Sequence, residues 1–151
     1  MLRVGTVGTS SIMRTIQEAI RLTDGMECRV VYSRTGEQGR AFAAEMGVPE
    51  HCTDYAAMLE RSDLDLIDIA SPNRFHAEQA LAALEHGKHV IVEKPAAVTR
   101  GDVQRLIDAA RANGVYFFEA ITTLFMPQYE ACRLLLPKLG RIEQAHITYA
   151  Q

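Results

Sequence analysis

The regular alternation of short β-branched runs with longer segments of helical periodicity constrains the fold of this chain most strongly. The predicted strands are residues 2–7, 27–33, 66–69, 89–92, 115–118 and 142–149, and the predicted helices are residues 11–22, 36–46, 55–61, 74–86, 99–113 and 127–136. Such alternation is typical of βαβ units, in which helices connect the parallel strands of one sheet and cover both of its faces. The sequence therefore predicts a doubly wound α/β fold.

Composition excludes several classes of protein. A chain of 151 residues is long enough for one domain with a full hydrophobic core. Its net charge is −3, so we expect no nucleic-acid partner, and no apolar run approaches the roughly 20 residues of a membrane span. The three scattered cysteines predict reduced thiols in a cytoplasm and no metal site. The N-terminus leads straight into a strand, so we expect no signal peptide.

The turn over residues 8–12 joins the first predicted strand to the first predicted helix. A dinucleotide-binding fold holds its pyrophosphate at this point, on the helix N-terminus. Of the G-x-G-x-x-G fingerprint only Gly8 is present, because Ser10 and Met13 occupy the other two glycine positions. Small residues still let the backbone approach a phosphate, and the hydroxyls of Thr9 to Ser11 add donors. A serine cluster that only caps the helix is the alternative.

The second predicted strand ends at Ser33, and Arg34 follows it. An NAD-specific fold usually carries Asp or Glu at this position, on the 2′-hydroxyl of the ribose. A hydroxyl and a guanidinium instead suit a 2′-phosphate, which favours NADP as the ligand. The alternative is a solvated arginine at the start of a helix.

The tripeptide Glu93-Lys94-Pro95 directly follows the apolar run of residues 89–92. The carboxyl ends of parallel strands are where open α/β sheets bind ligands. A lysine at this edge can neutralise an anion, donate to a reacting oxygen or take part in proton transfer. The structural alternative is a surface Glu–Lys pair before a proline that starts a helix.

Four segments together resemble the N-terminal domain of the Gfo/Idh/MocA family of NAD(P)-dependent oxidoreductases: residues 4–12, 32–34, 69–76 and 87–95. The resemblance implies a Rossmann-like doubly wound sheet, with an NAD(P)-binding domain over residues 1–120. It also implies that residues 121–151 form a connecting helix and the first strand of a C-terminal α+β domain that is otherwise essentially absent from this chain. Leu124 departs from the family pattern, since many members carry arginine there.

The resemblance also implies roles for individual residues. Lys94 would be the catalytic residue that faces the substrate. The residues that would bind NADP, or NAD, are Gly8, Thr9, Ser10, Ser11, Ile12, Ser33, Arg34, Ser71, Pro72, Asn73, His76, Glu93 and Lys94. His76 has an alternative, because a neutral imidazole in the first turn of a helix can simply satisfy a neighbouring backbone group.

The implied reaction is hydride transfer between a nicotinamide cofactor, with NADP favoured, and a sugar, polyol or related carbonyl or hydroxyl substrate. Two alternatives stay open: a non-catalytic NAD(P)-binding regulator or sensor, and a hydrolase or lyase that uses the nicotinamide transiently. The resemblance further implies a cytoplasmic homo-oligomer, assembled through the C-terminal domain, with a small sugar-like molecule as its partner. We expect this 151-residue chain to be inactive by itself.

Overall fold

The computed structural model describes residues 1–146 and 148 of the chain. These residues divide into two compact units, Met1–Ala120 and Ile121–Gln151.

The first unit is built on a six-stranded parallel sheet in the order β3-β2-β1-β4-β5-β6. Its strands are β1 (Leu2–Val7), β2 (Met26–Tyr32), β3 (Glu50–Cys52), β4 (Leu66–Ile69), β5 (His89–Val92) and β6 (Phe117–Glu119). The strand order reverses between β1 and β4, and such a reversal is the point at which doubly wound folds bind ligands. The α/β, Rossmann-like prediction is confirmed.

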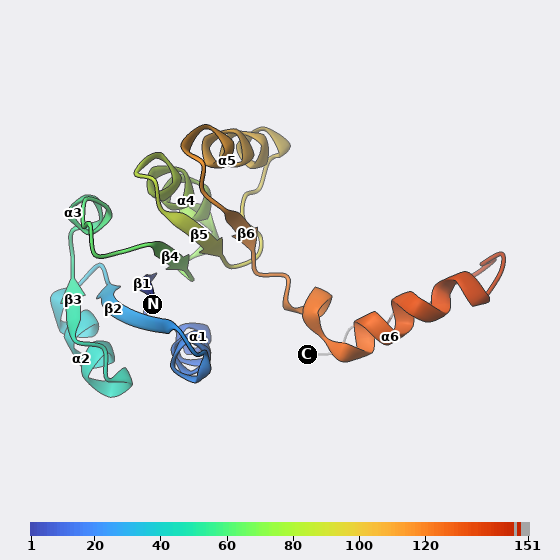
Figure 1. Ribbon diagram of the computed structural model, residues 1–151, viewed down its shortest axis with the longest axis horizontal. Coiled ribbons are helices and arrows are strands. Elements are labelled where there is room, and N and C mark those ends of the chain that lie inside the picture. The colour runs from blue at the N-terminus through green and yellow to red at the C-terminus, as the bar shows by residue number, and fades with distance from the viewer. Residues whose placement is uncertain (147, 149–151) are drawn as a thin grey trace. The chain divides into compact units, whose positions relative to one another are not determined.

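Helices cover both faces of this sheet. They are α1 (Ser11–Leu22), α2 (Gly36–Met46), α3 (Tyr55–Leu59), α4 (His76–Glu85) and α5 (Arg100–Asn113). In Figure 1, α1 and α2 lie on one side of the sheet, and α4 and α5 lie on the other. All four residues of β4 are buried, as a central strand packed on both faces requires. The buried centre of the sheet therefore supports the turns that follow β1, β4 and β5.

Several elements differ from those predicted, and three of the differences concern β3, the start of α4 and the start of β6. The short strand β3 was not predicted, and it exists through its pairing with β2. The fourth predicted helix begins with a 3₁₀ turn, Asn73–Phe75, and becomes α-helical only at His76. Strand β6 starts later than predicted, because the N–H of Val115 donates to the carbonyl of Ala110 at 3.0 Å and so belongs to the end of α5.

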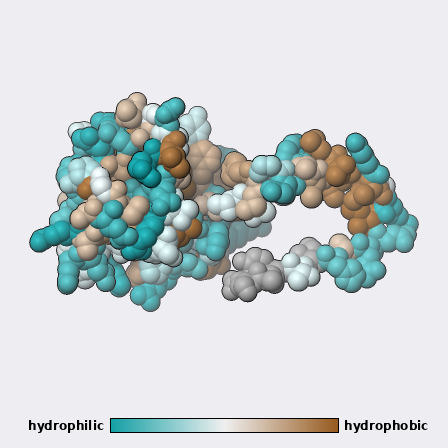
Figure 2. Space-filling model, turned by 90° about the horizontal axis from the view of Figure 1, so that it is seen from below, coloured by the Kyte–Doolittle hydropathy of each residue, from teal (hydrophilic) through white to brown (hydrophobic). Residues whose placement is uncertain are grey.

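In the described part of the second unit, the helix α6 (Pro127–Leu135) lies between two 3₁₀ turns, Thr122–Phe125 and Leu136–Lys138. Apolar side chains lie exposed along it, among them Leu134, Leu135, Leu136 and Leu139 (Figure 2). The strand predicted over residues 142–149 is wrong for residues 142–146 and 148, which form no strand and are exposed. An extended segment becomes a strand only by pairing, and these residues have no paired neighbour; residues 147 and 149 lie outside the described part.

None of the helices in the described part of the chain combines the length and apolarity needed to cross a membrane.

Candidate functional site

Two adjoining cavities lie at the carboxyl ends of β1, β2, β4 and β5, and both are lined by Ser10, Ala70, Ser71 and Pro72. The first cavity is further lined by Val7, Gly8, Thr9, Tyr32, Ser33, Arg34, Gln38, Phe75 and Gln79. The second is further lined by Ile12, Asn73, His76, Glu93 and Lys94. All the predicted site residues except Ser11, the first residue of α1, therefore line one continuous crevice.

The β1–α1 turn requires glycine at position 8. Gly8 has φ +115°, a backbone conformation that L side chains rarely adopt. Its N–H donates to the carbonyl of Tyr32 at 3.0 Å, and a Cβ at this position would lie 2.7 Å from the carbonyl oxygen of Ala70. The absent side chain thus allows the β1 turn to lie directly against the turn that follows β4.

The N-terminus of α1 presents unpaired donors to the crevice. The N-cap residue Ser10 makes no side-chain hydrogen bond to the first turn, and the first turn carries no acidic residue. Its backbone N–H groups and the positive end of the helix dipole therefore remain available to an anion. This arrangement fits a phosphate even though two fingerprint glycines are missing.

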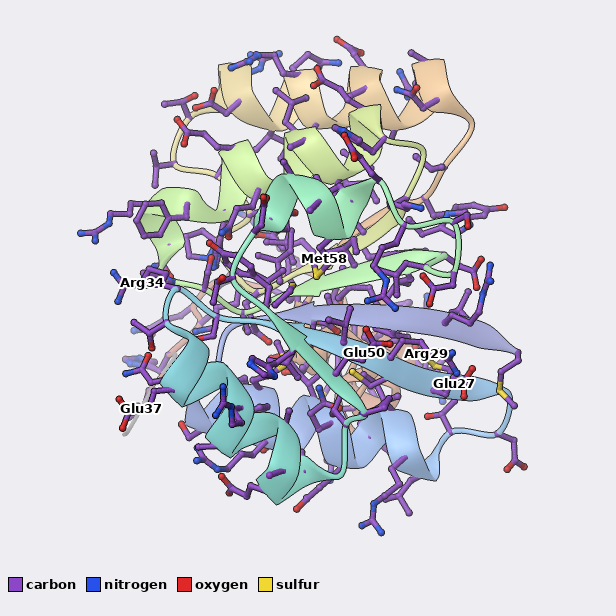
Figure 3. All side chains as sticks on the ribbon, turned by 90° about the vertical axis from the view of Figure 1, so that its left-hand side faces the viewer. Glu27, Arg29, Arg34, Glu37, Glu50 and Met58 are labelled. Atoms are coloured by element: carbon purple, nitrogen blue, oxygen red, sulfur yellow. The ribbon has the colours of Figure 1, made fainter. Side chains whose placement is uncertain are left out.

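Ser33 and Arg34 lie at the end of β2, at the rim of the first cavity. Ser33 is buried, and its N–H donates to the carbonyl of Cys52 at 3.0 Å. Figure 3 shows Arg34 at the end of the sheet opposite to Glu27 and Arg29. Arg34 forms no ion pair with any residue of the described chain, so its guanidinium is available at the crevice.

The turn after β5 carries Glu93 and Lys94 into the second cavity. The N–H of Glu93 donates to the carbonyl of Ile69 at 2.8 Å, which extends the β4–β5 pairing to the crevice. Beyond the cis Lys94–Pro95 bond, the N–H of Ala96 donates to the carboxylate of Glu119 at 2.9 Å. The exposed Lys94 forms no ion pair within the described residues, while the backbone on both sides of it is anchored.

His76 is buried between two turns of the crevice. Its Nδ1 lies 2.9 Å from the carbonyl oxygen of Pro95, and its Nε2 lies 2.6 Å from the carbonyl oxygen of Ser71. The ring therefore contacts backbone groups, as in the structural alternative, and it also lines the second cavity.

Six further lining residues were not among the predicted site residues: Val7, Tyr32, Gln38, Ala70, Phe75 and Gln79. Gln79 is the most informative, because its Oε1 accepts from the hydroxyl of Ser71 at 2.6 Å and its backbone carbonyl accepts from the hydroxyl of Tyr55 at 2.8 Å. Gln79 follows His76 by one helical turn, and this spacing on a helix that starts at the crevice is the signal that could have revealed it.

Asp68 is a buried carboxyl group in the middle of β4, and its Oδ1 has no hydrogen-bond partner in the described structure. Burial raises its pKa to about 7, and the negative charge of Glu93 acts in the same direction. The sequence assigned this residue only to a strand. With this pKa, the buried carboxyl group is partly ionised near neutral pH.

We expect Asp68→Asn to stabilise the chain at alkaline pH. The pKa of Asp68 rises from 3.8 to about 7 on folding, so the folded chain holds the proton more tightly and stability falls as pH rises through this window. The variant should be more stable by about 4 kcal/mol at pH 9 and little changed at pH 4. Urea unfolding at pH 4, 7 and 9 measures this difference.

Asp63→Asn is the matched control. The hydrogen-bonded Arg61 lowers the pKa of the half-buried Asp63 to about 2, so the contribution of this ion pair to stability is present above pH 4 and is lost only as pH falls toward 2. This control should give no gain at pH 9. An Asp68→Asn chain with the same pH dependence as the wild type would contradict the assigned shift.

The family model Gfo/Idh/MocA, an oxidoreductase family with an NAD-binding Rossmann fold, matches residues 2–121. The chain belongs to this family. It is 34% identical over 151 residues to scyllo-inositol 2-dehydrogenase (NADP⁺) of Bacillus subtilis, covering all of this chain and 46% of the relative. It is 39% identical over 116 residues to 1,5-anhydro-D-fructose reductase of Ensifer adhaerens, covering 76% of this chain and 34% of the relative. The chain thus spans less than half the length of these curated relatives.

Solved structures of family-like enzymes share the fold. A 3-ketoreductase from Actinomadura kijaniata, in complex with NADP and TDP-benzene, has a TM-score of 0.85 and 31% identity, covering 91% of this chain and 42% of that chain. Biliverdin reductase from Synechocystis, in complex with biliverdin and NADP⁺, has a TM-score of 0.82 and 29% identity, covering 93% of this chain and 44% of that chain. The same fold is therefore found in enzymes that bind NADP together with chemically unrelated second ligands, biliverdin and TDP-benzene.

Proposed function

We propose that this chain is the cofactor-binding part of an NADP-dependent oxidoreductase that transfers hydride between the nicotinamide and a carbon of a sugar- or polyol-like substrate. The observation that carries the proposal is one crevice that joins the glycine turn of β1, the Arg34 guanidinium and the Lys94 ammonium. Two relatives, the inositol dehydrogenase and the anhydrofructose reductase, are named for a polyol and a sugar derivative, which supports the proposed sugar- or polyol-like substrate.

The residues present fit the cofactor. Glycine at position 8 lets the β1 turn lie against the turn that follows β4, and the first turn of α1 offers N–H groups to the pyrophosphate. The hydroxyl of Ser33 and the guanidinium of Arg34 would donate hydrogen bonds to a 2′-phosphate. Ser71, Pro72, Asn73 and Glu93 line the second cavity and would border the nicotinamide half.

The bound cofactor would supply hydride chemistry, and the protein would supply position and electrostatics. Lys94 donates a hydrogen bond to the reacting oxygen of the substrate and assists the transfer of its proton. We further propose that the full-length protein forms a homo-oligomer through residues beyond this unit.

Steady turnover tests the reaction class. The full-length protein, mixed with NADP⁺ and a panel of inositols and aldoses, should produce NADPH absorbance that keeps rising with time. Binding of the cofactor with no turnover on any of these polyols would favour a regulator or sensor. Product formation with no net NADPH would favour a hydrolase or lyase that uses the nicotinamide transiently. Either of the latter outcomes would overturn the proposed dehydrogenase.

We expect the chain to bind NADPH more tightly than NADH, and Arg34→Ala to remove most of the difference. A charge-assisted hydrogen bond contributes about 1.5–3 kcal/mol, so the variant should weaken NADPH binding roughly 10- to 100-fold and leave NADH binding unchanged. Titration followed by nicotinamide fluorescence measures both constants.

Arg40→Ala is the control for this titration, because Arg40 is an exposed arginine of α2 that does not line the crevice. It should retain the preference of the wild-type chain for NADPH. Equal affinities of the wild-type chain for NADPH and NADH would remove the 2′-phosphate role from Arg34.

A further inference from the structure

The ring of His76 is placed between two groups that can only accept hydrogen bonds. Its Nδ1 lies 2.9 Å from the carbonyl oxygen of Pro95 and its Nε2 lies 2.6 Å from the carbonyl oxygen of Ser71. A neutral imidazole carries one N–H, so one of its nitrogens would direct a lone pair at a carbonyl oxygen within hydrogen-bond distance. The imidazolium carries two N–H groups and satisfies both carbonyls.

The two carbonyls belong to different turns of the crevice. Ser71 lies in the turn after β4, which lines both cavities, and Pro95 directly follows Lys94 in the turn after β5. His76 is 1% exposed, so its ring is shielded from water. The ring is therefore a direct link between the wall of the cofactor crevice and the lysine turn.

We propose that His76 is a positioning residue that works as the imidazolium, with both N–H groups fastening the Ser71 and Lys94–Pro95 turns at a fixed separation. The proposal rests on the proposed function, because the two turns are taken to border the nicotinamide and the reacting oxygen. His76 acts through the backbone of these turns, and its side chain performs no step of the reaction.

Charged groups around the ring come from several elements. Glu93 and Lys94, on the β5 turn, line the same cavity as the ring and carry opposite charges. Arg74 precedes the ring in the 3₁₀ turn, Glu78 follows it on α4, and Asp68 on β4 is coupled to Glu93. The residues that line this cavity from α1 and the turn before it, Ser10 and Ile12, are uncharged. Each nitrogen of the ring faces one carbonyl oxygen, and these two contacts are the ones on which the proposal rests.

The ¹⁵N chemical shifts of the histidine rings test the protonation state in the full chain. At pH 7 both ring nitrogens of His76 should show the shift of a protonated nitrogen. His86 is the internal comparison, because it is exposed on the same helix and has one carbonyl partner, that of Ala82, at 2.7 Å. An unprotonated ring nitrogen in His76 at pH 7 would overturn the proposal, whether or not the chain binds NADPH.

Two variants separate the two links. In His76→Asn the side-chain amide can replace Nδ1 and keep the bond to Pro95, and in His76→Gln the amide can replace Nε2 and keep the bond to Ser71. The backbone amide resonances of residues 70, 71 and 73 should therefore shift most in His76→Asn, and those of residues 93, 94 and 96 should shift most in His76→Gln. Equal shifts in both turns from either variant would contradict a two-sided link.

The variants should also divide binding from turnover. His76→Asn removes the link to Ser71 in the wall of the cofactor crevice. It should weaken NADPH binding about 10-fold, as expected for the loss of one charge-assisted hydrogen bond. His76→Gln frees the lysine turn and should lower kcat of the full-length enzyme about 10-fold with a smaller change in NADPH affinity. His86→Asn is the control and should change neither constant. Identical binding and turnover in the two variants would overturn the proposal, whereas a wild-type chain that fails to bind NADPH would contradict only the proposed function.

Discussion

Gly8→Ala is expected to abolish measurable NADPH binding and to destabilise the chain by about 3 kcal/mol, the upper end of the range for a strained backbone position. The φ of +115° at Gly8 is rarely adopted by alanine. The new Cβ would also lie 2.7 Å from the carbonyl oxygen of Ala70. This oxygen belongs to the backbone, so it cannot rotate away as a side-chain atom can. Either the β1 turn or the β4 turn must move.

The movement matters for binding because both turns line the first cavity. Pushing them apart displaces the first N–H groups of α1 from the pyrophosphate position. Thermal unfolding and NADPH titration of the same sample measure the two effects. Gly101→Ala is the matched control: Gly101 lies in α5 without positive φ, and its added Cβ would come no closer than 3.8 Å to Thr99 Oγ1. Wild-type stability and affinity in Gly8→Ala would show that the turn tolerates a side chain.

Local signals explain why most of the fold could be predicted from the sequence. Gly47 and Gly114 end their helices with φ of +71° and +66°, and the hydroxyl of Thr99 accepts from the N–H of Asp102 at the start of α5. These signals depend only on neighbours within four residues. Strand β3 has no such signal, since its three residues become a strand by pairing with β2, some twenty residues earlier.

The candidate site, like the fold, could be predicted from the sequence only in part. The topology rule, that parallel strands bring their carboxyl ends to one edge, was enough to group Gly8, Arg34 and Lys94 in one crevice. The rule says nothing about side chains that reach the crevice from a helix, so Gln79 was missed. It also says nothing about burial, so the raised pKa of Asp68 could not be read from the sequence.

Lys94→Ala is expected to lower kcat of the full-length enzyme about 10²- to 10⁴-fold, the usual contribution of a group that assists proton transfer. NADPH affinity should change less than about 3-fold, because the pyrophosphate and 2′-phosphate positions lie in the first cavity and Lys94 lines only the second. Stability should be unchanged, since the Lys94 side chain is exposed and forms no ion pair with the described residues.

Lys94→Arg separates the two chemical roles that a lysine can fill at this position. Arginine keeps the positive charge and the hydrogen-bond donors, but it does not release a proton at any ordinary pH. If Lys94 takes part in proton transfer, Lys94→Arg should be nearly as slow as Lys94→Ala, and kcat should lose the ionisation that the wild-type pH profile shows. If only charge is needed, Lys94→Arg should recover most of the lost turnover. Full turnover in Lys94→Ala would remove this residue from the mechanism and leave the crevice as a binding site alone.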